Sequence, residues 1–166
     1  DLRESSCNRV KIHFTGQDIL DLIKKIRENY PVFIFLSVGE REEGFYREAF
    51  NAGAKAVLFR FETSDSNLYS KLHPHSSLEK RARYLELFKE IGYIIATGSL
   101  IGLPGQNAES VIDDFMFAKE LGCDMYSFGP FIPHPDTPLS SQNTPDAEYM
   151  LKAISVLRLI DPYGKK

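Results

Sequence analysis

Polar and charged side chains follow each of four apolar runs that the sequence predicts as β-strands. In a parallel α/β protein, ligands bind at the carboxyl ends of the strands. These strand ends carry hydroxyl groups and charges of both signs, so the expected chemistry is recognition of a polar, charged ligand. The four strand ends are Ser37 to Glu40, Arg60 to Thr63, Thr97 to Ser99, and Ser127 to Gly129.

Arg60 and Glu62 are the charged pair at the second strand end. Residues two apart on a strand point to the same face, so this pair could hold a ligand with one anionic and one cationic group. An internal Arg–Glu ion pair explains the spacing equally well. Arg81 lies near the start of a predicted helix, where backbone N–H groups favour an anion. A solvated surface arginine beside Lys80 and Arg83 is the alternative.

Three further segments carry candidate groups with less specific patterns. The sequence GLPGQ at 102–106 suits close backbone approach to a ligand, although a structural turn explains it equally, and it lacks the Gly-Lys-Ser/Thr ending of a phosphate loop. His73 and His75 have no further metal ligand at a matching spacing, so we interpret them as polar loop residues. His134 lies in the proline-rich stretch 130–144, which we expect to be a functional loop, and Cys123 is interpreted as buried filler.

The pattern along the chain alternates between strand and helix periods. Strands are expected at 32–38, 56–62, 93–99 and 124–129, with a weak additional strand at 9–14, and helices at 17–29, 41–53, 77–92, 108–122 and 145–160. We expect Ser76 or Ser77 to cap the third helix and Gly92 to end it. The spacing predicts an α/β fold, a partial (half) TIM-type barrel of about four parallel βα units, because a complete barrel needs roughly 200 residues or more.

Composition narrows the possible partners. The formal net charge is −3 and the basic residues are dispersed along the chain, so no nucleic-acid surface is expected. The apolar run PVFIFLSV is too short to span a bilayer, so no membrane partner is expected. Two cysteines form no disulfide framework, which favours a cytoplasmic location. Because a half-barrel has exposed sheet edges, we expect self-association or a completing chain.

Three motifs together resemble a known enzyme family. They are RFETSDSNLYSKLHP at 60–74, GSLIGLPGQ at 98–106 and GPFIPHPDTPL at 129–139. From about Asp18 to Asp161 the chain resembles the barrel core of HydE, the radical S-adenosylmethionine (SAM) maturase of iron-iron hydrogenase, and more distantly methylornithine synthase and biotin synthase. The motif of the maturases commonly reads Arg-His-Glu-Thr, and Phe61 stands here in place of the histidine.

The resemblance implies a cofactor and a set of site residues. Members bind a 4Fe-4S cluster through C-x3-C-x2-C, and reductive cleavage of SAM gives methionine and a 5′-deoxyadenosyl radical that attacks a small-molecule substrate. By resemblance, the amino and carboxylate groups of SAM would be held by Glu62 and Arg81 with support from Arg60. The nucleoside would lie along Ser99, Leu100 and Gly102 under Phe131 to His134, and Thr97 and Thr137 would face the substrate cavity.

The sequence departs from this family in its cysteines. Neither Cys7 nor Cys123 belongs to a three-cysteine motif, and a cubane cluster needs thiolate ligands. We therefore expect residues 1–166 to form a single partial barrel domain that lacks the cluster-binding N-terminal segment and the C-terminal closing strands. It would be an inactive fragment of a radical SAM enzyme. The alternatives are a non-catalytic half-barrel that binds a partner or an adenosyl ligand, and a different α/β enzyme using Glu62 and His134 as acid and base.

Anaerobic reconstitution tests the cysteine argument directly. Treatment of the 166-residue chain with iron and sulfide should leave it without the visible absorption of an iron–sulfur cluster, because two isolated cysteines cannot ligate a cubane. A brown product with a full complement of cluster iron in each chain would contradict this expectation.

Overall fold

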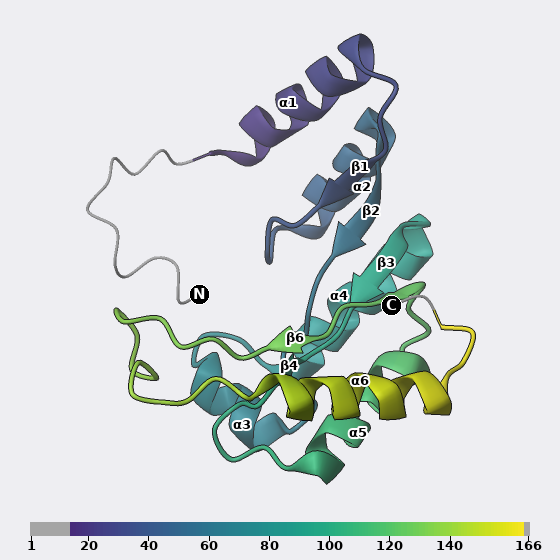
Figure 1. The fold of residues 1–166 in the computed structure, drawn as a ribbon. Helices are drawn as coiled ribbons and strands as arrows, with labels where there is room; N and C mark the ends of the chain where they lie inside the picture. The colour runs from purple at the N-terminus through teal and green to yellow at the C-terminus, as the bar shows by residue number, and fades with distance from the viewer. Residues whose placement is uncertain (1–13, 165–166) are drawn as a thin grey trace.

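The computed structural model describes residues 14–164, which form an open parallel sheet covered by helices (Figure 1). Four strands pair in the order β1-β2-β3-β5, and every pairing is parallel. A shorter parallel pair, β4 with β6, follows β3 and β5 along the chain. The strands are β1 (Ile34–Leu36), β2 (Ala54–Leu58), β3 (Ile94–Thr97), β4 (Leu100–Ile101), β5 (Met125–Tyr126) and β6 (Gly129–Pro130). The predicted α/β class with a partial barrel is confirmed.

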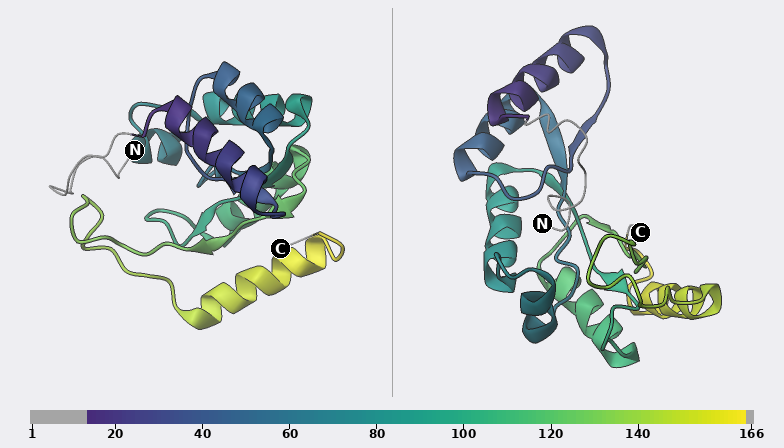
Figure 2. Two further views of the ribbon diagram at one scale, coloured as in Figure 1. Left: turned by 90° about the horizontal axis from the view of Figure 1, so that it is seen from above. Right: turned by 90° about the vertical axis from the view of Figure 1, so that its left-hand side faces the viewer.

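The described helices are α1 (Gly16–Asn29), α2 (Glu43–Ala52), α3 (Ser66–Leu72), α4 (Leu78–Ile91), α5 (Ala108–Glu120) and α6 (Ala147–Ile160). Helices α2 to α5 connect successive strands, whereas α1 precedes β1 and α6 follows β6 (Figure 2). In Figure 1, α1 and α2 lie at the β1 end of the molecule, and α5 and α6 lie together at the opposite end. The crossover helices thus keep the strands parallel, with all carboxyl ends at one edge.

Side chains at the helix ends explain where several helices begin and stop. Ser77 caps α4 by accepting a hydrogen bond from the backbone N–H of Lys80 (3.2 Å), and Gly92 ends it in the left-handed conformation (φ 99°). Both ends agree with the sequence prediction. Thr15 and Asp18 form a reciprocal capping box at α1, which satisfies backbone donors that the first turn leaves unpaired.

The main core lies between the sheet and three helices. Leu36, Val57 and Ile95 from the three strands β1, β2 and β3 pack against side chains of α1, α2 and α4. Tyr46 is central to this layer, with its ring centroid 4.5 Å from that of Phe88. A smaller cluster of Phe61, Tyr69, Leu78 and Ala118 joins the loop after β2 to α3, α4 and α5. The two clusters fix the helices that border the carboxyl ends of the strands.

Several predicted elements and boundaries differ from the structure. The sequence analysis missed α3, which begins after Asp65 because that side chain accepts from the backbone N–H groups of Asn67 and Leu68. The last helix starts at Ala147 rather than 145, since Asp146 caps it. Regular pairing of the strand expected at 56–62 stops at Leu58. The weak strand expected at 9–14 falls on residues 9–13, outside the described residues, and on Phe14, which is not in a strand.

The sheet is open on both sides among the described strands. β1 pairs only with β2, and β5 pairs only with β3. Phe33 and Phe35 beside the β1 edge are 59% and 40% exposed, and their rings contact each other edge-to-face. Between residues 14 and 164, no helix is both long and apolar enough to cross a bilayer.

Gly98, between β3 and β4, offers a test of the packing at the strand ends. A Cβ atom there would lie 2.3 Å from the backbone oxygen of Ser127, so Gly98→Ala should lower the free energy of unfolding by about 1–3 kcal/mol through overpacking. Gly44→Ala in α2 is the matched control, because its Cβ would meet nothing within 4 Å and alanine favours a helix. Urea denaturation measures both, and equal stabilities for the two variants would contradict the packing described here.

Candidate functional site

Arg60 and Glu62 lie together just beyond the end of β2. A terminal nitrogen of Arg60 is 3.3 Å from Oε2 of Glu62. The same nitrogen donates a hydrogen bond to the backbone oxygen of Ser99 (2.8 Å). Both charged side chains keep about a quarter of their surface exposed, 23% and 25%. The structure therefore contains the internal ion pair that the sequence left open, and it leaves part of both groups accessible to a ligand.

The backbone at Glu62 is unusual and is held by neighbouring residues. Glu62 has φ 69°, the only described non-glycine residue with a positive φ, a conformation that such residues rarely adopt. The oxygen of Gly98 accepts from the N–H groups of Phe61 and Glu62, and Leu100 N–H donates to the oxygen of Glu62. Glu62 consequently leaves the regular strand, while Phe61 is fully buried with its ring against that of Phe117.

Arg81 points inward from the first turns of α4. Its side chain is 14% exposed, and its Nε donates to the hydroxyl of the buried Tyr69 (3.2 Å). The guanidinium lies 4.3 Å from the centre of the Phe59 ring. The surface interpretation of Arg81 was therefore wrong. Because Phe59 directly precedes Arg60, Arg81 contacts the segment that leads into the Arg60–Glu62 pair.

Glu40, at the end of β1, is a second partner of Arg81. It accepts from Ser76 Oγ and Lys80 Nζ, both at 2.6 Å, and lies 3.8 Å from a terminal nitrogen of Arg81. Burial acts to raise the pKa of Glu40, but Lys80, Ser76 and Arg81 outweigh it, so the pKa lies below the ordinary value. The sequence placed Glu40 at a strand end but gave no sign of these partners, which come from the loop before α4 and from α4 itself.

Thr97 and Ser99, at the end of β3, are fully buried. The hydroxyl of Thr97 donates to the backbone oxygen of Phe59 (2.7 Å), and Ser99 forms an isolated parallel bridge with Glu62. These residues thus connect the β3 end to the β2 end that carries the charged pair.

The short pair β4–β6 brings together two of the predicted nucleoside segments. The N–H of Phe131 donates to the oxygen of Ile101 (2.8 Å), between Leu100 and Gly102. Gly102 has φ 87°, and the Pro145 ring occupies the space where its Cβ would stand. Phe131 is buried.

His134 and Thr137, by contrast, lie in the loop after β6. The His134 side chain is 61% exposed, and its Nδ1 lies 3.9 Å from Oδ2 of Asp136. Thr137 Oγ1 donates to the backbone oxygen of His134 (2.9 Å), so the contacts within this pair are local to the loop.

Metal-ligand chemistry has no support in the part of the chain that the structure describes. No group of three or more His, Cys, Asp or Glu side chains there could hold a metal ion. Cys123 is half-buried, and burial raises the pKa of its thiol to about 11. A thiol with this pKa is protonated at neutral pH, which agrees with the interpretation of Cys123 as filler.

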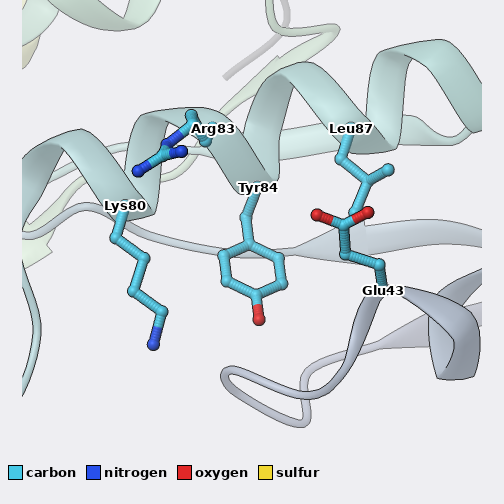
Figure 3. Close-up of a pocket in the computed structure, with 5 residues that line it drawn as sticks. All are labelled: Glu43, Lys80, Arg83, Tyr84 and Leu87. Atoms are coloured by element: carbon cyan, nitrogen blue, oxygen red, sulfur yellow. The ribbon is translucent and has the colours of Figure 1, made fainter.

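A pocket on the helical layer borders the charged network through Lys80, the partner of Glu40 (Figure 3). Its volume is about 280 Å³, and it is lined by Glu43 of α2 and by Lys80, Arg83, Tyr84 and Leu87 of α4. None of the predicted site residues lines it. Since it lies between two helices rather than at the strand ends, we do not assign it to the ligand.

Sequence reasoning missed a buried polar network behind the site. Asp114 is fully buried in α5 and accepts hydrogen bonds from Ser64 and Gln106. The available sign was an acidic residue in the apolar stripe of α5, which includes Val111 and Phe115.

Comparison with known proteins finds relatives of this chain among radical SAM enzymes. No family model matches the sequence. It is 41% identical over 144 residues to the [FeFe] hydrogenase maturase subunit HydE of Thermotoga maritima, covering 87% of this chain and 41% of that protein. It is 28% identical over 144 residues to biotin synthase of Sulfurihydrogenibium sp., covering 87% of this chain and 43% of that protein. The chain thus spans less than half the length of these relatives.

Solved structures agree with the sequence comparison. Methylornithine synthase (PylB) superposes with a TM-score of 0.82 at 29% identity, over 89% of this chain and 44% of that one. Coproporphyrinogen III oxidase (HemN) of Escherichia coli, a radical SAM enzyme, gives a TM-score of 0.70 at 18% identity over 89% of this chain and 37% of that one. At that identity the second likeness concerns the fold alone.

His73 makes the stability of this site dependent on pH. Burial, with the charge of Arg81 next in size, lowers the pKa of His73 from 6.5 to about 4. Between pH 6.5 and about 4 the folded chain therefore binds fewer protons than the unfolded chain. The stabilisation that comes from keeping His73 neutral is complete above pH 6.5, and the free energy of unfolding declines as the pH falls towards 4.

We expect His73 to account for a loss of roughly 1 kcal/mol between about pH 7 and pH 5, allowing for screening of a half-buried group. Urea denaturation of the wild type and of His73→Gln at both pH values measures how much of the pH-dependent loss of stability comes from His73. An identical pH dependence in the two proteins would contradict it.

Proposed function

The chain belongs to the radical SAM superfamily as a relative of HydE, and we propose that it supplies the SAM-binding part of such a barrel. Arg81 would bind the carboxylate of the methionyl group, and Glu62 would bind its amino group. The observation that carries this assignment is the inward orientation of Arg81 against Phe59, beside the strand end that bears Glu62. An amino-acid zwitterion requires one group of each sign.

The contacts of Arg81 suit an acceptor that a ligand provides. The Tyr69 hydroxyl and the Phe59 ring fix the guanidinium. Its distance to Glu40, 3.8 Å, is longer than a hydrogen bond. A terminal nitrogen therefore retains donor capacity for a carboxylate, and little side-chain entropy remains to be lost on binding.

The other predicted residues extend this site as proposals. Arg60 would support Glu62, to which it is already paired. Leu100 and Gly102 would lie along the nucleoside beside Ser99, and β4–β6 pairing brings their segment next to that of Phe131. We propose in the same way that His134 closes over the adenine side, and that Thr97 and Thr137 face the substrate cavity.

The residues present do not fit a 4Fe-4S cluster. The sequence has two cysteines, far apart in the chain and outside any three-cysteine motif. When cluster and SAM act together in radical SAM enzymes, they supply a 5′-deoxyadenosyl radical. The proposed function of this chain is therefore to bind and orient SAM. The small-molecule substrate of HydE-like chemistry remains a property of the relatives.

We also propose that residues 1–166 act as one partial barrel domain whose open edges pair with further strands, from a completing chain or from a second copy. This pairing is supported by β1 and β5, which have one neighbour each, and by the exposed side chains of Phe33 and Phe35.

A non-catalytic half-barrel that binds a partner is the second candidate function, and the same open edges favour it. We propose a reducing, cytoplasmic location on the low cysteine content of the sequence.

Isothermal titration with SAM tests the proposed site. The wild-type chain should bind, and Arg81→Ala should weaken binding by roughly 10- to 100-fold, because a charge-assisted hydrogen bond to the ligand carboxylate is lost. Arg83→Ala is the matched control, since Arg83 is an exposed arginine on the same helix. Unchanged affinity in Arg81→Ala would remove its role, and absence of binding by the wild type would overturn the proposed function.

A further inference from the structure

Asp114 is a buried acidic residue in an otherwise apolar helix face. With Val111, Phe115 and Ala118 it forms the fully or nearly fully buried stripe of α5. A carboxylate in such a stripe is costly unless its hydrogen bonds are satisfied. Burial raises the pKa of Asp114, and the hydrogen bonds that the carboxylate accepts lower it only in part. Packing alone would be served by an aliphatic side chain, so the contacts of the carboxylate identify what the position does.

One carboxylate oxygen of Asp114 holds the turn that follows Glu62. It accepts from the backbone N–H of Ser64 (2.5 Å) and from Ser64 Oγ (2.7 Å). Thr63 Oγ1 lies 3.4 Å away. Thr63 and Ser64 directly follow the left-handed Glu62, so this oxygen fixes the backbone that aims the Glu62 carboxylate.

The other carboxylate oxygen reaches the GLPGQ loop through Gln106. Gln106 Nε2 donates to Asp114 (2.9 Å) and to the oxygen of Leu100 (3.0 Å). Gln106 Oε1 accepts from the N–H groups of Gly102 (2.7 Å) and Leu103 (3.2 Å). Both polar atoms of the Gln106 amide therefore hold the loop around Gly102. The bond to Asp114 sets the orientation of this amide.

We propose that Asp114, acting through Gln106, is a positioning residue that holds the two halves of the ligand site in register. One half is the turn at Glu62, which would bind the amino group, and the other is the segment Leu100 to Gly102, which would lie along the nucleoside. This inference rests on the proposed function. Neither Asp114 nor Gln106 touches the ligand, so the effect on affinity arises from preorganisation of groups that do.

Asp114→Asn tests the pair without changing the size of the side chain. If the new NH₂ group faces Ser64, the hydroxyl can turn to accept from it, but the backbone N–H of Ser64 loses its acceptor. If the NH₂ group faces Gln106, the Gln106 amide must turn over, and Gly102 and Leu103 lose their acceptor. Because either arrangement loosens a loop that the ligand must meet, SAM binding should weaken at least about tenfold by isothermal titration.

The double variant Asp114→Asn with Gln106→Glu is the rescue. The carboxylate introduced at position 106 can accept from the NH₂ group introduced at position 114 and from the N–H groups of Gly102 and Leu103, whereas the oxygen of Leu100 loses its donor and faces a carboxylate oxygen. We therefore expect a partial rescue, with affinity at least about threefold higher than in Asp114→Asn alone, because two loop amides regain their acceptor while one carbonyl is left unsatisfied. Failure of the rescue in a folded double variant would overturn the pairing.

Val111→Ala separates positioning from general stability. It removes buried methyl groups from the same stripe of α5 but alters no side-chain hydrogen bond to either loop, so it should lower the urea midpoint without weakening binding. If affinity falls in Val111→Ala as it does in Asp114→Asn at equal stability, the effect is structural and the proposal is overturned.

Amide hydrogen exchange followed by NMR distinguishes this inference from the proposed function. In Asp114→Asn, the amides of Ser64, Gly102 and Leu103 should exchange at least about tenfold faster, while those of β2 are unchanged. The double variant should restore Gly102 and Leu103. Unaltered exchange at these amides would overturn the coupling. Normal coupling in a wild-type chain that binds no SAM would overturn the ligand role instead.

Discussion

The close contact of three backbone segments at the ends of β2, β3 and β5 is the constraint on which the site depends. Gly98 lies at their centre, since its oxygen accepts from both Phe61 and Glu62 while its Cα faces the backbone of Ser127. Only a residue without a Cβ permits this approach. The contact bends the chain after β2 out of regular pairing and gives Glu62 its left-handed conformation. The position of the charged pair at this edge follows from it.

Electrostatic balance at the strand ends comes from pairing between elements. Arg60 pairs with Glu62, and Glu40 lies among Ser76, Lys80 and Arg81. Charges that remain partly solvated and paired in this way cost little to hold in place. Each of these side chains can exchange its internal partner for a ligand group that has the same sign as that partner. This property separates the strand ends from the hollow between α2 and α4, where no predicted residue converges.

The relationship to HydE and PylB concerns a shared piece of barrel. The chain matches 41% of the HydE relative and 44% of the PylB chain, and its open sheet has two unpaired edges among the described strands. The matched piece contains the charged strand ends and the loops that would surround an adenosyl ligand. The cysteine motif that gives the family its radical chemistry has no counterpart in these 166 residues.

The sequence by itself determined the βα alternation, the helix ends at Ser77 and Gly92, and Arg60 and Glu62 as candidate binding residues, because periodicity, caps and charges at strand ends are local properties. The binding role of Arg81 was predicted only through the family resemblance. The sequence missed α3 and Asp114, since a short helix has too few residues to show a period and a buried acid is recognised only by its donors. Tertiary structure alone decided that Arg81 points inward and that Asp114, with Gln106, joins two loops. Both depend on contacts between residues distant in the chain, such as Ser64 with Asp114, 50 positions apart.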